Sequence, residues 1–435
     1  MALITYQDFL KTSNLKDFFL ESIRKHKMSE TYKIAVDAEK YMKRRNPTIQ
    51  QYQKILYSAE GVPYRDIYSP NYKLSSGFFP RLISQEVQYL LAHGMSLDDE
   101  KDKQKLGAKF DLTLRKLATT ALVQGVAYGF WAYDRLEILK LTEFIPFVDE
   151  KDGSIKAGLR FWQLSSSKPL RLTLFEIDGV SDYIIEDNQL SLYKKKRAYI
   201  KKTIKHAETT IYEGENYKQF PIIPLYGNYS KQSELIGIRE QIDAYDLIKS
   251  GFANDIDSEQ VYWILKNVGG MNTSDLQKFR DRLKTVKAAV TDDETEISSH
   301  TVEIPYKARE KYLQILKEGI IEDFQGLDSA KLQTGSRTAT EIEASYEAIN
   351  AKVSSLEENI KEFLLELFDI VGITSTPTFT RSMLLNKKEE ISNIVALRGL
   401  VNDEILISQL SFLTPAEKEK AIELCRLQQR SLDDT

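Results

Sequence analysis

Side chains that could catalyse a reaction or hold a metal ion are few in this sequence and far apart. The chain has four histidines and one cysteine, namely His26, His93, His206, His300 and Cys425. A metal site on a helix places two histidines three or four residues apart, and no pair has that spacing. The glycine–lysine pattern of a phosphate-binding loop and the glycine–serine pattern of a nucleophile elbow are also absent. We therefore expect no enzyme activity, no metal and no cofactor.

Two charged clusters could still bind ions. The acidic turn at residues 292–294 could hold a divalent cation, although a solvated turn is the favoured interpretation. The basic run KKKRAYIKK, residues 194–202, mixes lysine and arginine with alanine, tyrosine and isoleucine, which predicts an exposed strand or hairpin. Such a cluster could contact DNA phosphates, while a solvated face is the more common role. The sequence leaves this choice open.

Bulk composition limits the class of protein. With 435 residues the chain exceeds the usual size of one hydrophobic core, so we expect two or more structural regions. Lysine and arginine number 60 against 64 acidic residues, a balance that gives no support for tight DNA binding. The lone cysteine rules out a disulfide within the chain and fits a reducing compartment. We expect no signal peptide and no transmembrane helix, and hence a soluble intracellular product.

The hydrophobic pattern divides the first half of the chain into helical and strand-rich parts. Residues 6–56 are predicted to be helical, and a turn-rich stretch follows at 61–80. Helices are expected at 81–92 and 106–125, where apolar residues recur at helical spacing. Short runs of β-branched and aromatic residues separated by turns then predict a β-rich region at about 128–211.

A long helix is predicted at residues 233–266. Its apolar residues recur every three or four positions, at Leu235, Ile238, Ile242, Tyr245, Ile248, Phe252 and Ile256. We expect a short helix at 273–286, strands near Ala288 and Val302, and a second helix at 305–325. A polar segment bounded by glycines follows at 326–336.

The most regular segment is the helix predicted at residues 337–372. Its apolar residues alternate in steps of four and three: Ile342, Tyr346, Ile349, Val353, Leu356, Ile360, Phe363 and Leu367. At ~1.5 Å per residue this helix would be roughly 50 Å long. A single slender subunit is not expected to cover the whole stripe, so we predict that these residues pack in the core and against neighbouring copies. Short helices should follow in 373–435, one of them starting at Pro415.

The order of these segments, more than any one motif, resembles the portal proteins of tailed bacteriophages. The resemblance runs through SPNYKLSSGFFPRLISQEVQYLLAHGM (69–95), QGVAYGFWAYD (124–134) and RSMLLNKKEEISNIVALRGLVNDEILISQL (381–410). The most specific stretch is FPIIPLYGNYSKQSELIGIREQIDAYDLIKSGFANDID (220–257), in which a proline-rich strand leads through a polar turn into a helix. TPAEKEKAIEL (414–424) also fits.

The resemblance implies an α+β subunit that is mainly helical and has four regions, called wing, stem, clip and crown. The implied divisions are a wing at 1–232 with its β-rich part at 128–211, stem helices at 233–266 and 305–325, a clip at 267–304, a channel loop at 326–336, a long wing helix at 337–372 and a crown at 373–435.

The resemblance also implies a function and a set of partners. Family members form a homo-oligomeric ring, usually dodecameric, at one capsid vertex, where double-stranded DNA passes during packaging and ejection. The ring docks the terminase motor and later a head-completion or tail adaptor protein, and it meets capsid and scaffolding proteins but no membrane. The expected location is the virion, after assembly in the bacterial cytoplasm. The candidate DNA-contacting residues of the channel loop are Ser329, Lys331, Gln333, Thr334 and Arg337.

Two other classes of protein remain as alternatives. A coiled-coil structural or scaffolding protein would explain the stripe of the helix at 337–372, but not the β-rich region or the insert at 267–304. A nucleic-acid-processing enzyme would need a cluster of carboxylates or histidines that the sequence lacks. Particle shape separates the first alternative from a portal, since a scaffold would form rods and a portal rings with a central hole.

Overall fold

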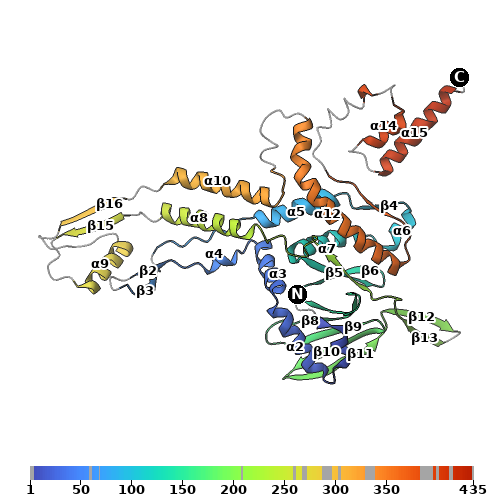
Figure 1. Ribbon diagram of the computed structural model, residues 1–435, viewed down its shortest axis with the longest axis horizontal. Helices are drawn as coiled ribbons and strands as arrows, with labels where there is room; N and C mark the ends of the chain where they lie inside the picture. Colours follow the sequence, from blue (N-terminus) through green and yellow to red (C-terminus); the bar gives the residue numbers. More distant parts are fainter. Residues whose placement is uncertain are drawn as a thin grey trace.

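The computed structural model confirms an α+β fold rich in helices, with a pair of helices that extends from a larger body (Figure 1). The structure describes residues 4–57, 61–67, 69–206, 209–257, 261–266, 272–286, 296–301, 305–328, 339–382, 395–397, 401–410 and 415–433.

Four helices open the chain, and each begins at a side chain that caps it. They are α1 (Tyr6–Lys11), α2 (Leu15–Met28), α3 (Glu30–Met42) and α4 (Pro47–Gln51). The capping side chains of Thr5, Asn14, Ser29 and Asn46 accept hydrogen bonds from free backbone N–H groups of the first turn. A short strand, β1 (Ile4–Thr5), precedes them.

The predicted β-rich region forms two sheets and a separate hairpin. The larger sheet has the order β1-β7-β8-β9-β10-β11 and the smaller has the order β14-β5-β6, while β12 and β13 pair with each other. The strands are β5 (Val126–Ala132), β6 (Arg135–Lys140), β7 (Phe144–Val148), β8 (Ile155–Trp162), β9 (Leu170–Glu176), β10 (Gly179–Glu186), β11 (Gln189–Arg197), β12 (Ile200–His206), β13 (Thr209–Glu215) and β14 (Ile222–Tyr226). One face of the larger sheet is buried against aromatic and aliphatic residues of α1 and α2.

The main core lies where three helices meet the smaller sheet. These helices are α5 (Phe78–Leu91), α7 (Phe110–Gln124) and α12 (Ala339–Val371), and they enclose one continuous apolar cluster with β5, β6 and β14. Gly129 of β5 leaves room for the Phe363 ring of α12, because an added Cβ at residue 129 would lie 2.5 Å from that ring. The predicted long helix is α12.

The extended helix pair corrects one prediction. The first helix, α8 (Arg239–Asp257), begins six residues after the predicted start at 233 and ends nine residues before the predicted boundary at 266. The pair is completed by α10 (Tyr306–Asp323). Residues 261–266 instead form strand β15 (Val261–Lys266), which pairs with β16 (Glu296–Thr301). The physical reason is local: the helical stripe stops at Ile256, and VYWILK is rich in the β-branched and aromatic residues that favour strands.

The insert at the end of the helix pair contains β15, β16 and helix α9 (Thr273–Val286), which matches the predicted short helix (Figure 1). The strand predicted near Ala288 lies outside the described residues. The strand predicted near Val302 is β16, a few residues earlier.

The remaining elements are short, except for the last helix. They are β2 (Ile55–Tyr57), β3 (Pro63–Arg65), β4 (Met95–Leu97), α6 (Glu100–Lys105), β17 (Pro377–Phe379), α14 (Asp403–Gln409) and α15 (Pro415–Asp433). Strand β17 pairs with β4, which brings the chain after α12 back to the body. Helix α15 starts at Pro415, as predicted.

Candidate functional site

The residues predicted to contact DNA fall on a part of the chain that the structure does not describe. Ser329, Lys331, Gln333, Thr334 and Arg337 all lie outside the described residues. The structure does describe the chain that leads to them, residues 324–328 after α10.

The predicted packing stripe lies inside the subunit. Tyr346, Ile349, Val353, Leu356, Ile360, Phe363 and Leu367 are each at most 2% exposed and belong to the main core with α5, α7 and β14. The side chain of Ile342 lies outside the described part of the chain. Because the subunit itself covers these seven side chains, their burial does not require neighbouring copies. Any oligomer must be argued from other surfaces.

A buried charge cluster joins four elements at the base of the helix pair. Lys352 of α12 lies 2.5 Å from a carboxylate oxygen of Glu234, which precedes α8, and 2.9 Å from the carbonyl oxygen of Phe324 at the end of α10. Its Nζ atom also lies 3.4 Å from the centroid of the Phe324 ring, a cation–π contact. The fourth member is Glu86 of α5, whose Oε2 atom is 3.8 Å from Lys352, too long for a hydrogen bond.

Burial dominates the protonation of this cluster. Removal from water raises the pKa of Glu86 to about 8, and the negative charge of Glu234 acts in the same direction, while Lys352 opposes both. The single ammonium group of Lys352 therefore lies near two carboxyl groups, those of Glu86 and Glu234. Glu86 is the one that keeps its proton near neutral pH. We call Glu86, Glu234, Phe324 and Lys352 the base cluster.

The chain that leaves α10 is anchored beside the base cluster. Gln85 of α5 donates a hydrogen bond from Nε2 to the carbonyl oxygen of Leu327 at 2.9 Å and accepts one from the Leu327 N–H at 3.0 Å. This paired contact satisfies both backbone groups, as a neighbouring strand would. The start of the segment predicted to be the channel loop is thus fixed to the body.

A second polar cluster fastens the chain before α5 to α8. Asp246, Ser250 and Asn254, spaced four residues apart, accept hydrogen bonds from the N–H groups of Ser76, Leu74 and Tyr72 at 2.8, 3.0 and 2.6 Å. Every second N–H of an extended chain points the same way, so alternate residues meet one face of the helix. The sequence analysis missed this ladder, although its polar positions at helical spacing were visible between the apolar ones.

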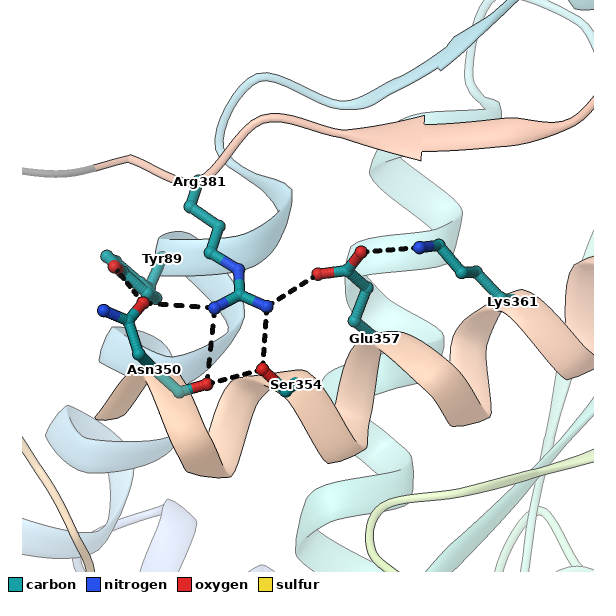
Figure 2. A network of polar contacts seen from close by, with 6 residues as sticks. All are labelled: Tyr89, Asn350, Ser354, Glu357, Lys361 and Arg381. Carbon is teal, nitrogen blue, oxygen red and sulfur yellow. Dashed lines mark hydrogen bonds and ion pairs between the residues drawn. The ribbon is translucent and has the colours of Figure 1, made fainter. Parts of the chain in front are cut away.

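Arg381 holds the chain that follows β17 against α12 (Figure 2). One guanidinium nitrogen donates to the Asn350 carbonyl and side-chain oxygens at 3.3 and 3.1 Å, and the other donates to Ser354 and Glu357 at 2.9 and 3.0 Å. Tyr89 completes the network by donating its hydroxyl proton to Asn350 at 2.6 Å. The network sets the direction in which the C-terminal region leaves the body.

The basic run at 194–202 is partly neutralised within the subunit. Lys196 forms ion pairs with Glu176 and Asp178, and Arg197 forms one with Asp182. At least these two cations are engaged inside the sheet, which favours a structural role for that half of the run.

His26, one of the four histidines, lies in the core of the subunit. His26 is buried, its Nε2 lies 2.7 Å from the Leu141 carbonyl oxygen, and burial lowers its pKa. Within the described part of the chain, no three histidine, cysteine, aspartate or glutamate side chains converge to form a metal site. Among the same residues, no helix combines the length and hydropathy needed to cross a bilayer.

Comparison with known proteins gives a consistent set of relatives. A family model described as "Phage portal protein, SPP1 Gp6-like" matches residues 22–431. The portal protein of Clostridium phage phiCD119 is 29% identical over 391 residues, which cover 81% of this chain and 84% of that protein. The portal protein of Bacillus phage SPP1 is 22% identical over 406 residues, covering 86% and 80% of the two chains.

Solved structures of gene transfer agent (GTA) particles show a weaker likeness. A chain from the virion of the native particle has a TM-score of 0.41 at 9% identity and covers 80% of this chain and 89% of that one. A chain from the neck of the native particle, computed with C12 symmetry, has a TM-score of 0.40 at 10% identity, with coverage of 78% and 90%.

Proposed function

Because the chain belongs to the SPP1 Gp6-like family of phage portal proteins, we propose that it forms a homo-oligomeric ring of twelve copies at one capsid vertex. The ring is the channel through which double-stranded DNA enters during packaging and leaves at ejection. The observation that carries this proposal is the family match, which spans residues 22–431 and so includes the body, the helix pair and its terminal insert.

The regions of a portal map onto the fold as follows. The body before α8, together with α12, is the wing, and α8 with α10 is the stem. In this proposal the clip is the insert that contains β15, α9 and β16; we include β15 because it pairs with β16, which moves the proposed start from residue 267 to 261. The channel loop is residues 326–336, and the crown is 373–435.

The proposed partners follow from this arrangement. The clip docks the terminase motor during packaging and a head-completion or tail adaptor protein afterwards. The wing and crown contact capsid and scaffolding proteins. The protein is not an enzyme: the energy for DNA movement comes from the motor, and the ring contributes a channel. It is assembled in the bacterial cytoplasm and remains in the virion.

Negative-stain electron microscopy of the purified protein tests the proposal directly. We expect closed rings with a central hole and a diameter set by the number of subunits. Rods would instead support the coiled-coil alternative, for which the buried stripe of α12 gives no exposed seam. Particles that remain single subunits at all concentrations would overturn the proposed ring.

A further inference from the structure

An exposed apolar arm lies beside the helix pair. The arm comprises residues 52–57, 61–67 and 69–74, and its strands β2 and β3 pair only with each other among the described residues. Ile55, Tyr57 and Ile67 are 55%, 66% and 71% exposed. An isolated two-stranded ribbon is marginally stable in water, and clustered exposed apolar side chains mark interaction surfaces. The arm therefore has the character of a docking element.

The chain that leads into the arm and the returning end of the arm are both fastened to α8. Before the arm, Asp243 accepts hydrogen bonds from Tyr41 of α3 and Thr48 of α4 at 2.5 and 2.8 Å. At the returning end, the ladder described above holds Tyr72 and Leu74 against α8. An element held in one direction before binding loses little conformational freedom when a partner arrives.

Helix α8 separates the arm from α10. The side chains that meet the arm include Ser250, whereas Phe252 and Asp255 meet Arg309 of α10. Residues two positions apart on a helix point about 200° apart, so the arm and α10 lie on opposite sides of α8. Figure 1 shows the same order, with α10, α8 and the chain that carries α4 and β2–β3 side by side.

The outer surfaces of the arm and α10 match in position along the pair. Two contacts fix how α10 lies along α8: Arg309 of α10 pairs with Asp255, and Asp323 of α10 contacts Gln241. Tyr312 and Ile315 lie between Arg309 and Asp323 on α10, so they are level with the middle of α8. That is the level at which the ladder holds the base of the arm. Tyr312 and Ile315 are 48% and 51% exposed, and Tyr52 and Tyr72 on the arm are 43% and 48% exposed. Apolar surface is thus available at one height on both sides.

The charges match at the next level, closer to the body. Arg44 and Arg45 are exposed between α3 and α4, on the chain that leads into the arm, near the residues that contact Asp243 and Asp246 of α8. On the other side of the pair, at the end of α10 nearest the body, Glu322 is exposed. Opposite charges on two surfaces steer association and set its register.

We propose that the arm of one copy of this chain packs against α10 of the next copy. A closed ring needs two different surfaces that meet head to tail, and the arm and α10 lie on opposite sides of α8 at matching heights. Apolar residues meet at the middle of the pair, and Arg44 and Arg45 meet Glu322 nearer the body. This inference rests on the proposed ring and names one interface within it.

Cross-linking between two single-cysteine variants tests the arm. Tyr72→Cys and Ile315→Cys are made separately in a Cys425→Ser background, given tags of different size, and co-expressed. A short bifunctional thiol reagent should then produce a covalent dimer that carries both tags. Neither variant expressed alone should give this product. Leu164→Cys, 77% exposed in the β-rich region, is the matched control partner for Ile315→Cys and should give none.

The outcomes separate this inference from the proposed function. The arm interface is overturned if rings form but the cross-linked product with both tags does not. It is also overturned if the thiol introduced by Tyr72→Cys still reacts with a maleimide reagent in the assembled ring. Neither result contradicts the ring itself. A parent protein that forms no rings overturns the proposed function and this interface with it. In support, Ile315→Asp on α10 should weaken ring assembly at least tenfold while the unfolding temperature of the unassembled chain stays unchanged, because this side chain is 51% exposed within the subunit.

Discussion

At the scale of single residues, the base cluster shows how one buried lysine can organise several elements. Lys352 contacts the chain just before α8, the end of α10 and, at longer range, α5. No pattern in the sequence distinguishes this lysine from the others of the chain, since its partners lie far away in sequence and only the fold brings them together. Such clusters are the part of a site that a single sequence does not predict.

The protonation of Glu86 leads to a pH prediction. Its folded-state pKa is raised to about 8 from an ordinary value of 4.5, so its proton stabilises the fold below the lower value and that contribution is lost as pH rises to the higher one. Glu86→Gln, which keeps the neutral shape, should therefore gain stability relative to the parent between about pH 5 and 8, by at most ~1.4 kcal/mol per pH unit. Unfolding free energies from urea titrations at several pH values measure this.

The control for this variant is Glu137→Gln, which alters an exposed carboxylate paired with Arg135. Its stability relative to the parent should change little over the same range. Equal pH slopes for Glu86→Gln and the parent would show that Glu86 is not protonated in the folded protein.

Arg381 provides a second prediction at this scale. Arg381→Ala removes the hydrogen bonds to Asn350, Ser354 and Glu357, although Tyr89 still donates to Asn350 and Lys361 to Glu357. Because one of the lost bonds joins two charged groups, we expect a loss of about 1–3 kcal/mol in the free energy of unfolding. Faster hydrogen exchange is expected at the Ser382 N–H, which donates to the Tyr89 carbonyl at 2.8 Å.

Arg381→Lys is the matched control, because it keeps the charge but cannot reach two groups with a planar fork. It should fall between the parent and Arg381→Ala. An Arg381→Ala protein with parental stability and exchange would mean that the network does not hold the C-terminal chain.

At the scale of elements, periodicity predicted some helices well and others poorly for identifiable reasons. Helix α12 was predicted within two residues of each end because its stripe is long, unbroken and buried. The end of α8 was missed because a strand follows it with equally apolar residues, and apolarity alone does not separate the two. Its ladder to residues 72–76 was missed because each pair of partners lies 170 to 182 residues apart in sequence, so that only the fold brings them together.

Leu356 tests the burial of α12. Leu356 is 1% exposed, so Leu356→Asp would bury a carboxylate without a partner and should cost several kcal/mol. The matched control is Leu365→Asp on the same helix, since Leu365 is 54% exposed and a charge there stays hydrated. Thermal unfolding of the two variants should differ strongly. Similar melting temperatures would contradict the orientation of α12.

The channel loop is tested by deletion. Replacement of residues 328–334 by a few glycines should leave ring assembly intact, because both flanking helices are anchored to the body through Phe324, Leu327 and the stripe of α12. Packaging or retention of DNA should fall, since Lys331 would no longer meet phosphates. Its contacts are expected to be weak in salt, because charges are screened over ~8 Å at physiological ionic strength. Normal packaging and retention in phage with the short loop would refute the proposed contact.

At the scale of the whole molecule, the order of the segments predicted the family and the α+β fold. It did not predict which helices and strands pack against one another. The stripe of α12 was expected to need neighbouring copies, but the body wraps around it. A pattern shows that a surface must be buried and does not show by which part of which chain. For that reason the argument for a ring now rests on family membership and on exposed surfaces elsewhere.

Light scattering gives the whole-molecule prediction. The purified protein at tens of micromolar should have a mass many times that of the 50.0 kDa chain, and the assembly should persist in several salts. A mass of one chain under all these conditions would count against a closed ring.

The hydrogen-bond ladder between α8 and the arm also depends on how far the helix and the extended chain advance from one hydrogen bond to the next. Four residues of helix advance ~6.0 Å, while two residues of extended chain advance ~6.6–6.8 Å, so each rung adds a mismatch of somewhat under 1 Å. Three rungs fit within the tolerance of a hydrogen bond, and a longer ladder would drift out of register. A single-residue insertion on either side would turn every N–H away from its acceptor. Length changes in this region should therefore be confined to the chain beyond the ladder, at the free end of the arm.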